Sequence, residues 1–291
     1  MQKLILLLIS CFVQQTAAQS SLTATQWQDD LRFLQKTIHN DYSFLVKKTT
    51  KEAFDADVET LYSNIPNLEE HEIVIGLARL VSSFKYGHTV LGFRYQPHAF
   101  HQLPFNLYQF NDGVFIQGVH KDYQQALGAK VIAVAGVPIE NALKAIYPVV
   151  PVENDQFFKA YAGMYLSCPE VLHAQGVIKE LSTTVEFTLE KEGKTFKQTF
   201  NALPIGERVP TKYSLVQQEG DWLDARKITH LGILSSLIRS IIMNIYRNKK
   251  QFILDIVRYK TIPKRIFQPF TSVFSILSII MMLNVWCWMY V

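Results

Sequence analysis

Three stretches near the N-terminus repeat apolar residues at the spacing of one helix face. They run from Thr25 to His39, from Thr50 to Ile65 and from Leu68 to Val81. A period near 3.6 residues predicts amphipathic helices that bury one side in a core. Thr25 and Thr50 suit the N-caps of the first two helices. The expected core positions are Trp27, Leu31, Leu34, Ile38, Phe54, Val58, Leu61, Ile65, Ile73, Leu77, Leu80 and Val81. We therefore predict a three-helix N-terminal cap domain over residues 19–86.

The pattern becomes β-rich after Gly87. Runs of β-branched and aromatic residues cover 89–93, 103–110, 114–119, 131–134, 184–189 and 196–200. Asn111-Asp112-Gly113 and Glu192-Gly193-Lys194 are turn sequences that predict two β-hairpins. Helical spacing returns over 141–147, 155–167 and 174–181. The sequence thus predicts an α+β fold, with a mixed β/α module over 87–205 and a linker over 206–230.

Residues 1–18 have the features of an export signal. Lys3 gives a positive start, Leu4 to Val13 are apolar but too few to span a bilayer, and Thr16-Ala17-Ala18 places small residues at a cleavage site. We expect cleavage before Gln19 and a mature protein in the periplasm, the cell envelope or the medium. Leu8-Ile9-Ser10-Cys11 also resembles a lipoprotein cleavage box, which would attach a lipid instead.

Charge and cysteine content exclude several functions. The net charge is +4, and residues 231–291 carry eight Lys and Arg against one acid, so the excess does not mark a nucleic-acid surface. Cys168 is the one cysteine of the mature body before the tail, so no disulfide framework is expected and a packed thiol is. The histidines His98, His101, His120 and His173 lack the spacing of metal ligands. We predict no metal site and no cofactor.

The order of the segments resembles the front half of a bacterial peptidase family. After the leader come WQDDLRFLQKTIHNDYSFLVKKTT, LPFNLYQFNDGVFIQG, LGAKVIAVAGVPIENAL and VEFTLEKEGKTFKQTF. Over residues 19 to about 225 the chain resembles the tail-specific (C-terminal-processing) serine peptidases. The most specific piece is the third helix leading into Gly87-His88-Thr89, where relatives have an acidic residue at the place of Tyr86. The strand, turn and helix from 131 to 147 resemble a PDZ-type module.

The resemblance implies a serine-type endopeptidase that acts on proteins or peptides. It implies that His88 is the general base, as in the tricorn-like branch, whereas the residues alone also allow a turn histidine that satisfies backbone groups. It implies that Leu127, Gly128 and Ala129 bind peptide through backbone N–H groups while the peptide adds as a strand. The family's nucleophile lies on a downstream core that opens with a strand like LVLDLR, which this reading frame lacks. We therefore expect no cleavage by this chain.

The last sixty residues do not resemble the family. Residues 266–291 carry no charge, Lys264 and Arg265 precede them, and Trp286 and Trp288 suit a membrane interface. This pattern predicts a transmembrane anchor. It also gives an alternative function, a membrane-anchored PDZ-like protein that binds peptides without catalysis.

The codons of the C-terminus give a second interpretation of the tail. Trp286 to Val291 must be encoded TGG TGY TGG ATG TAY GTN. Read one base earlier, these codons give Leu, Met or Val, then Val-Leu-Asp-Val, then Arg or Cys. This string is close to the strand that opens the family's catalytic core. We therefore favour a frameshifted or truncated family member, in which the apolar tail is a product of coding, over a membrane anchor.

Overall fold

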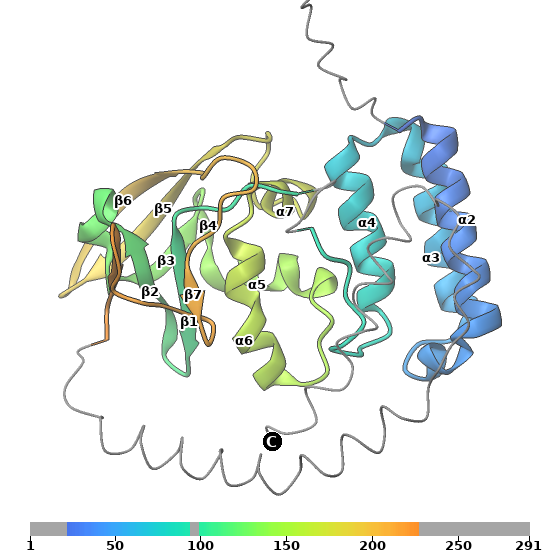
Figure 1. The fold of residues 1–291 in the computed structure, drawn as a ribbon, viewed down its shortest axis with the longest axis horizontal. Coiled ribbons are helices and arrows are strands. Elements are labelled where there is room, and N and C mark those ends of the chain that lie inside the picture. Colours follow the sequence, from blue (N-terminus) through green and yellow to red (C-terminus); the bar gives the residue numbers. More distant parts are fainter. Residues whose placement is uncertain (1–21, 94–98, 227–291) are drawn as a thin grey trace, which may run out of the picture.

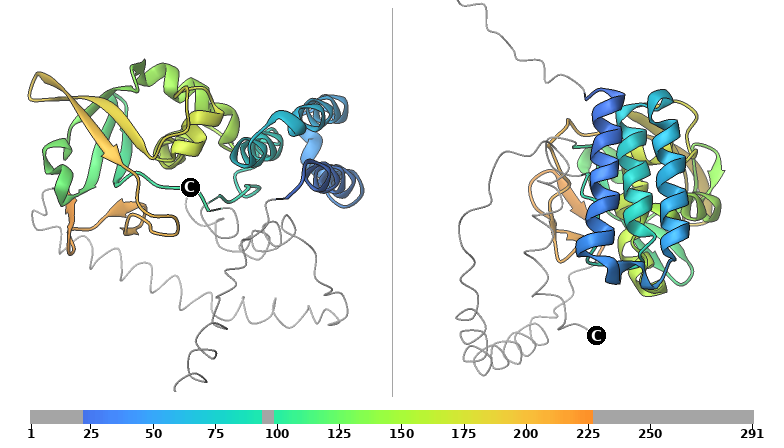
Figure 2. Two further views of the ribbon diagram at one scale, coloured as in Figure 1. Left: turned by 90° about the horizontal axis from the view of Figure 1, so that it is seen from above. Right: turned by 90° about the vertical axis from the view of Figure 1, so that its right-hand side faces the viewer.

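The computed structural model describes residues 22–93 and 99–226. Three helices form one side of the molecule, an antiparallel sheet forms the other, and further helices lie between them (Figures 1 and 2). The predicted α+β class is confirmed. The predicted signal peptide at 1–18 and tail at 231–291 lie outside the described residues. Within the described ranges, no helix is both long enough and apolar enough to cross a bilayer.

The three predicted N-terminal helices all form. They are α2 (Ala24–Asp41), α3 (Lys51–Asn64) and α4 (Glu70–Ser82), and α3 contacts both of the others. Short 3₁₀ helices η1 (Ser43–Lys47) and η2 (Ile65–Asn67) lie in the connections. Every apolar position predicted for the core of these helices is buried.

The first helix begins earlier than predicted. Its N-cap is Thr23 instead of Thr25, because Gln26 completes a capping box in which each side chain bonds the backbone N–H of the other residue. The prediction for α3 is confirmed, since the Thr50 hydroxyl accepts a hydrogen bond from the N–H of Ala53 at 3.1 Å.

The sheet is antiparallel throughout, with the strand order β1-β2-β3-β5-β6. The strands are β1 (Phe105–Phe110), β2 (Gly113–His120), β3 (Lys130–Val134), β5 (Thr184–Lys191) and β6 (Lys194–Asn201). The short β4 (Val137–Pro138) pairs with β3, and η3 (Lys121–Ala126) connects β2 to β3. Both predicted hairpins, β1–β2 and β5–β6, are therefore confirmed.

Two tight turns require positive φ angles. Ala135-Gly136 joins β3 to β4 with φ values of 49° and 80°, and Glu192-Gly193 joins β5 to β6 with values of 52° and 74°. Positive φ at both central residues matches the twist of an antiparallel hairpin. Glycine at the second position adopts this conformation without a steric penalty.

Helices on the sheet side are α5 (Ile139–Ile146), α6 (Asp155–Leu166) and α7 (Pro169–Ala174), with η4 (Tyr147–Val149) after α5. The first two were predicted. The predicted helix over 174–181 is wrong, because α7 ends where that helix was to begin. Gly176, at φ +70°, donates to the carbonyl of His173, and Val177 donates to that of Leu172, both at 2.8 Å. These two bonds form a Schellman motif, which closes a helix.

The predicted strand over 89–93 is also wrong. Leu91 and Phe93 are buried, but this segment pairs with no strand of the described chain. Phe93 instead stacks on Phe100 with ring centroids 5.3 Å apart, and its carbonyl accepts from the N–H of Phe100 at 2.8 Å. The β-rich composition here reflects burial of large side chains and not strand pairing.

Strands also form beyond residue 205, within the segment predicted to be a linker. They are β7 (Thr211–Lys212), β8 (Leu215–Val216) and β9 (Trp222–Asp224), and β9 pairs with β2. Buried Gln117 of β2 holds this segment: its Oε1 accepts from Val216 N at 2.9 Å and its Nε2 donates to Asp224 Oδ1 at 2.8 Å. A Cβ on Gly118 would lie 2.2 Å from the Val216 side chain. Residues 211–224 are therefore part of the packed fold.

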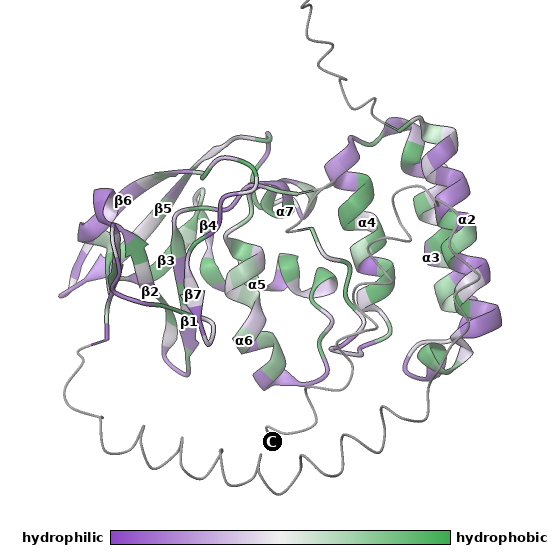
Figure 3. Cartoon of the chain, in the orientation of Figure 1, coloured by the Kyte–Doolittle hydropathy of each residue, from purple (hydrophilic) through white to green (hydrophobic). Residues whose placement is uncertain are grey.

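One hydrophobic core runs through both sides of the molecule. Its buried residues extend from Trp27 to Phe200 without a break at residue 86. Helix α4 is buried on most sides, since it packs between α3 and α7 (Figure 2), and its apolar residues are prominent in the hydropathy colouring (Figure 3). A helix that buries most of its surface, as α4 does apart from its first turn and Arg79, is typical of a core position.

Candidate functional site

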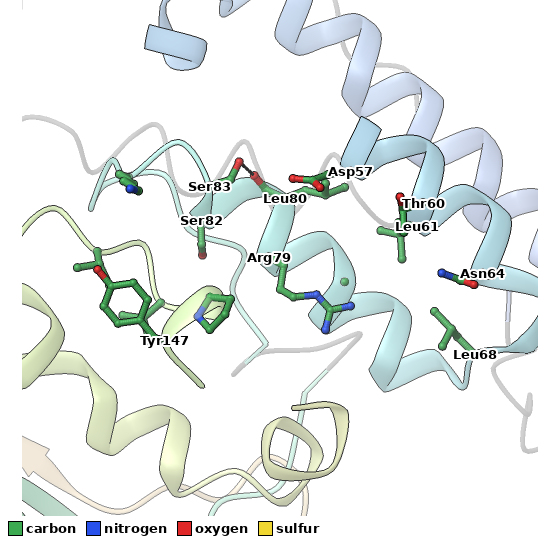
Figure 4. Close-up of a pocket in the computed structure, with 15 residues that line it drawn as sticks. Asp57, Thr60, Leu61, Asn64, Leu68, Arg79, Leu80, Ser82, Ser83 and Tyr147 are labelled. Atoms are coloured by element: carbon green, nitrogen blue, oxygen red, sulfur yellow. Dashed lines mark hydrogen bonds between the residues drawn. The ribbon is translucent and has the colours of Figure 1, made fainter. Parts of the chain in front are cut away.

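A cavity of about 490 Å³ opens between α3, α4 and η4 (Figure 4). Leu61, Leu80 and Tyr147 contribute apolar walls, and Asp57 and Arg79 contribute charge. A largely apolar cavity with a few charged groups is typical of a site that accepts a side chain or a small ligand. The cavity is therefore a candidate ligand site within the described chain.

Arg79 is the most constrained charge in this cavity. Burial lowers the pKa of its guanidinium, while nearby Glu72 and Asp57 oppose that change. Its Nη1 donates to Gln175 Oε1 at 3.0 Å, in the amide orientation that also lets Gln175 Nε2 donate to the Ala145 carbonyl at 2.9 Å. Arg79 thus supplies a fixed positive charge that connects α4 to the residues after α7.

The two serines of the cavity are not arranged as nucleophiles. The Ser82 hydroxyl donates to the carbonyl of Val149 at 2.8 Å. The Ser83 hydroxyl donates to the carbonyl of Leu80 at 2.7 Å (Figure 4). A serine nucleophile needs a neighbouring base that accepts its proton. Across residues 22–93 and 99–226, no serine or threonine hydroxyl is hydrogen-bonded to a His or Lys side chain.

His88, the predicted general base, lies half-buried in the turn that follows α4. The neighbouring Gly87 donates its N–H to Glu153 Oε1 at 2.7 Å. A Cβ on Gly87 would lie 2.3 Å from the Phe157 ring, so a larger residue here would have to displace that ring. The structure brings no hydroxyl of the described chain into hydrogen-bond contact with His88, and its catalytic role stays a prediction.

The predicted peptide-binding loop lies between η3 and β3. Its three backbone N–H groups already have partners within the chain: Leu127 donates to Gln124 at 3.1 Å, Gly128 to Ile116 at 2.9 Å, and Ala129 to Ala126 at 3.1 Å. A peptide carboxylate would have to replace these bonds. Leu127, Gly128 and Ala129 also belong to a different part of the fold from His88, which follows α4.

One group of side chains in the described residues has the composition of a metal site. His71 Nε2 lies 2.8 Å from His173 Nδ1, and Glu72 Oε1 lies 4.0 Å from the same nitrogen. Burial lowers the pKa of His71, and the nearby His173 lowers it further. From its spacing in the sequence, His173 was not expected to be a metal ligand. The sequence gives no signal for this pair, because only the packing of α4 against α7 brings the two histidines together.

The predicted packed thiol is confirmed, since Cys168 is buried and forms no disulfide. Comparison with protein-family profiles gives no match for this chain, and comparison with curated proteins gives none either.

Proposed function

We propose that this protein is the polypeptide-binding front half of an exported protein of the tail-specific serine peptidase type, and that this chain binds extended polypeptides without cleaving them. The open edge of β6 is the observation that carries the proposal. The segment order quoted for the family resemblance, together with the export features of residues 1–18, supports the class and the location.

Strand β6 is the last strand of its sheet. In an antiparallel ladder, alternate residues direct their N–H and C=O groups toward the neighbouring strand and away from it. The bond from Asn201 N to the Tyr123 hydroxyl and the bond from Ala202 N to the Thr183 carbonyl fix this alternation. Thr195, Lys197 and Thr199 therefore point their backbone groups away from β5.

These three residues form the binding edge that we propose. Their side chains are exposed, and within the described chain none of their N–H groups has a hydrogen-bond acceptor. An extended segment laid beside β6 would satisfy those donors by adding a strand, a mode in which main-chain bonds supply affinity with little dependence on sequence. Such binding suits the unfolded chains or chain ends that a tail-specific peptidase takes as substrates.

The β6 edge is a better binding strand than the loop at 127–129. The loop would lose three internal hydrogen bonds on binding, whereas Thr195, Lys197 and Thr199 would gain partners. A buried donor that loses its partner costs about 1–3 kcal/mol. We therefore assign the first contact to β6.

A proline substitution tests the edge directly. Lys197→Pro removes an outward N–H but no bond to β5, so the sheet is retained while strand addition is blocked. Lys197→Ala is the matched control, because it removes the same side chain and its ion pair with Glu186 but keeps the N–H. Binding of a fluorescent, permanently unfolded polypeptide should weaken about tenfold or more in Lys197→Pro and change little in Lys197→Ala. Equal affinity in both variants would refute the β6 assignment.

The second half of the proposal, that this chain does not cleave the polypeptides it binds, is tested by a separate assay. The full-length protein, incubated with an unfolded protein substrate, should give no fragments beyond those of a buffer control. Cleavage that a serine-directed inhibitor stops would overturn this half of the proposal. Sequencing the gene beyond codon 230 tests the broken reading frame: an insertion or deletion, followed by an open frame with a Gly-rich loop and a nucleophilic serine, is the expected result.

The alternative function is a membrane-anchored peptide-binding protein, favoured by the uncharged run at 266–291. An intact reading frame together with resistance to alkaline extraction from membranes would support it over the truncated peptidase.

A further inference from the structure

The contact between α4 and α7 brings together side chains that the proposed polypeptide binding does not use. His71 lies in the first turn of α4 and His173 in the last turn of α7, and the two helices pack side by side (Figure 1). The His71 side chain is 8% exposed and that of His173 is 18% exposed. Two imidazoles with nitrogens 2.8 Å apart, at a place with little solvent, form a preorganised pair.

Two carboxylates complete this cluster. Glu72 Oε2 accepts the N–H of Glu69 at 2.9 Å and so caps α4, which leaves Glu72 Oε1 directed at the histidines, 4.0 Å from His173 Nδ1. Glu69 Oε2 lies 3.5 Å from His71 Nδ1. If His71 carries its proton on Nδ1, this carboxylate stabilises that tautomer, and Nε2 is left with a lone pair that can bind a metal ion. A carboxylate behind a histidine is the usual arrangement around metal-ligating imidazoles.

From this geometry we infer that His71 Nε2, His173 Nδ1 and Glu72 Oε1 bind one zinc ion. Two histidines and a glutamate are a common zinc ligand set, with Zn–N distances of about 2.0–2.1 Å. Two nitrogens on one tetrahedral zinc lie about 3.3 Å apart by the same geometry. The imidazoles must therefore separate by roughly half an ångström, and zinc displaces the proton that they share. All three ligand atoms already lie within 4.8 Å of one another.

The surrounding charges set limits on the site. Arg79 lies near Glu72 and opposes a cation, whereas Glu69 and Glu170 lie near His71 and favour one. Glu170 is also bound to His101, with His101 Nδ1 2.5 Å from Glu170 Oε1. Because Glu72 is 26% exposed, zinc has a path from solvent, and a fourth position remains for water. The ion would cross-link α4 to α7 and so tie the helical side of the molecule to the sheet side.

The experiment uses the full-length protein, purified without a polyhistidine tag and stripped with a chelator. After dialysis against ZnCl₂ and then against metal-free buffer, elemental analysis should find about one zinc per chain. Thermal unfolding at a zinc concentration about 100-fold above Kd should shift Tm upward by about 5–10 °C. Co²⁺ should give the visible absorption bands of a low-coordinate site.

Three variants separate a metal site from a structural histidine pair. Glu72→Gln keeps an oxygen to cap α4 but removes the ligand charge, and His173→Gln removes one imidazole; both should lose the zinc-dependent Tm shift. His120→Gln is the matched control, because His120 lies on β2 at 24% exposure and outside the cluster, and it should keep the shift. Failure of the wild-type protein to retain zinc, or an unchanged shift in both cluster variants, would refute the site. Polypeptide binding at β6 is measured without zinc, so either proposal can fail alone.

Discussion

The two outer strands of the sheet, β1 and β6, differ in what covers their outer edges. The edge of β1 is covered by α6, where Gly163 lies so close to Leu107 that an added Cβ would be 2.9 Å from its Cβ and 3.1 Å from its carbonyl oxygen. No further strand of the described chain pairs with β6, and η3 contacts β6 at Asn201 and Gln198 while Thr195, Lys197 and Thr199 keep their outward N–H groups without a partner. The strand carries Lys194 and Lys197. Covering an edge and placing lysine on it are both ways in which proteins prevent uncontrolled strand pairing.

The difference shows that the edge of β1 serves the packing of the fold, whereas the edge of β6 is available for pairing with an added strand. A helix over β1 excludes a partner, whereas lysines on β6 only select against partners that are apolar and flat. The lysines leave the backbone donors of β6 accessible to a single extended chain. The contrast predicts that changes at β1 act on stability and that changes at β6 act on binding.

The largest expected effect is a difference in stability between proline substitutions at β6 residues whose N–H groups point toward β5 and at residues whose N–H groups point away from it. Gln198 pairs with Phe187, and its N–H points toward β5, so Gln198→Pro removes a ladder bond and should cost about 3 kcal/mol of unfolding free energy. Lys197→Pro, one residue away, should cost no more than about 1 kcal/mol. Urea denaturation measures both. Similar losses in the two variants would show that the assigned alternation of β6 is wrong.

A second, smaller effect tests the cover over β1. Gly163→Val should destabilise the protein by about 2 kcal/mol, because the new side chain drives α6 away from Leu107. Ala160→Val introduces the same side chain at an exposed position of α6 and should cost less than about 1 kcal/mol. If Gly163→Val were neutral in the same denaturation assay, α6 would not be a tight cover for this edge.

The smallest expected effect concerns Asp55 in α3, outside the sheet, and it serves as a control for the predictions about the sheet edges. Partial burial alone would raise the pKa of Asp55, but hydrogen bonds from Gln35, Lys51 and His39 lower it to about 2. A carboxyl whose folded pKa is depressed contributes stability above its unfolded value of 3.8, and this contribution is lost as the pH falls toward 2.

Because solvent screens this carboxylate, we expect the loss to be only about 1 kcal/mol between pH 5 and pH 2. Asp55→Asn should flatten that part of the stability–pH curve. It should leave the contrast between Gly163→Val and Ala160→Val unchanged, and a change in that contrast would mean that the α2–α3 contact and the β1 edge are coupled.

The helical side was predictable because its signals are local. In each of the three helices, apolar residues such as Trp27, Phe54 and Leu77 are spaced about one helical turn apart, and the face that they form is buried. The hairpins were equally clear, since Asn111-Asp112-Gly113 and Glu192-Gly193 fix their turns within the sequence itself. The predictions at 89–93 and 174–181 were wrong because the composition of each segment fits more than one structure. At 89–93 the stacking of Phe93 on Phe100 replaces strand pairing, and at 174–181 Gly176 at positive φ ends the helix.

The long-range contacts were not predictable. Gln117 holds Val216 and Asp224 from about a hundred residues away, and His71 meets His173 from a similar distance. No periodicity links such positions, because they meet only after the sheet and α7 have formed. The open edge of β6 was hidden for the same reason: a hairpin sequence does not reveal which of its strands ends a sheet.

Residue-resolved amide exchange tests the central claim most directly. The full-length protein is compared with and without a saturating unfolded polypeptide. The β6 edge predicts slower exchange at Thr195, Lys197 and Thr199, with little change at Phe196 and Gln198, whose N–H groups already bond β5. Protection that appears at residues 127–129 or around the cavity of α4, with β6 unchanged, would contradict the account.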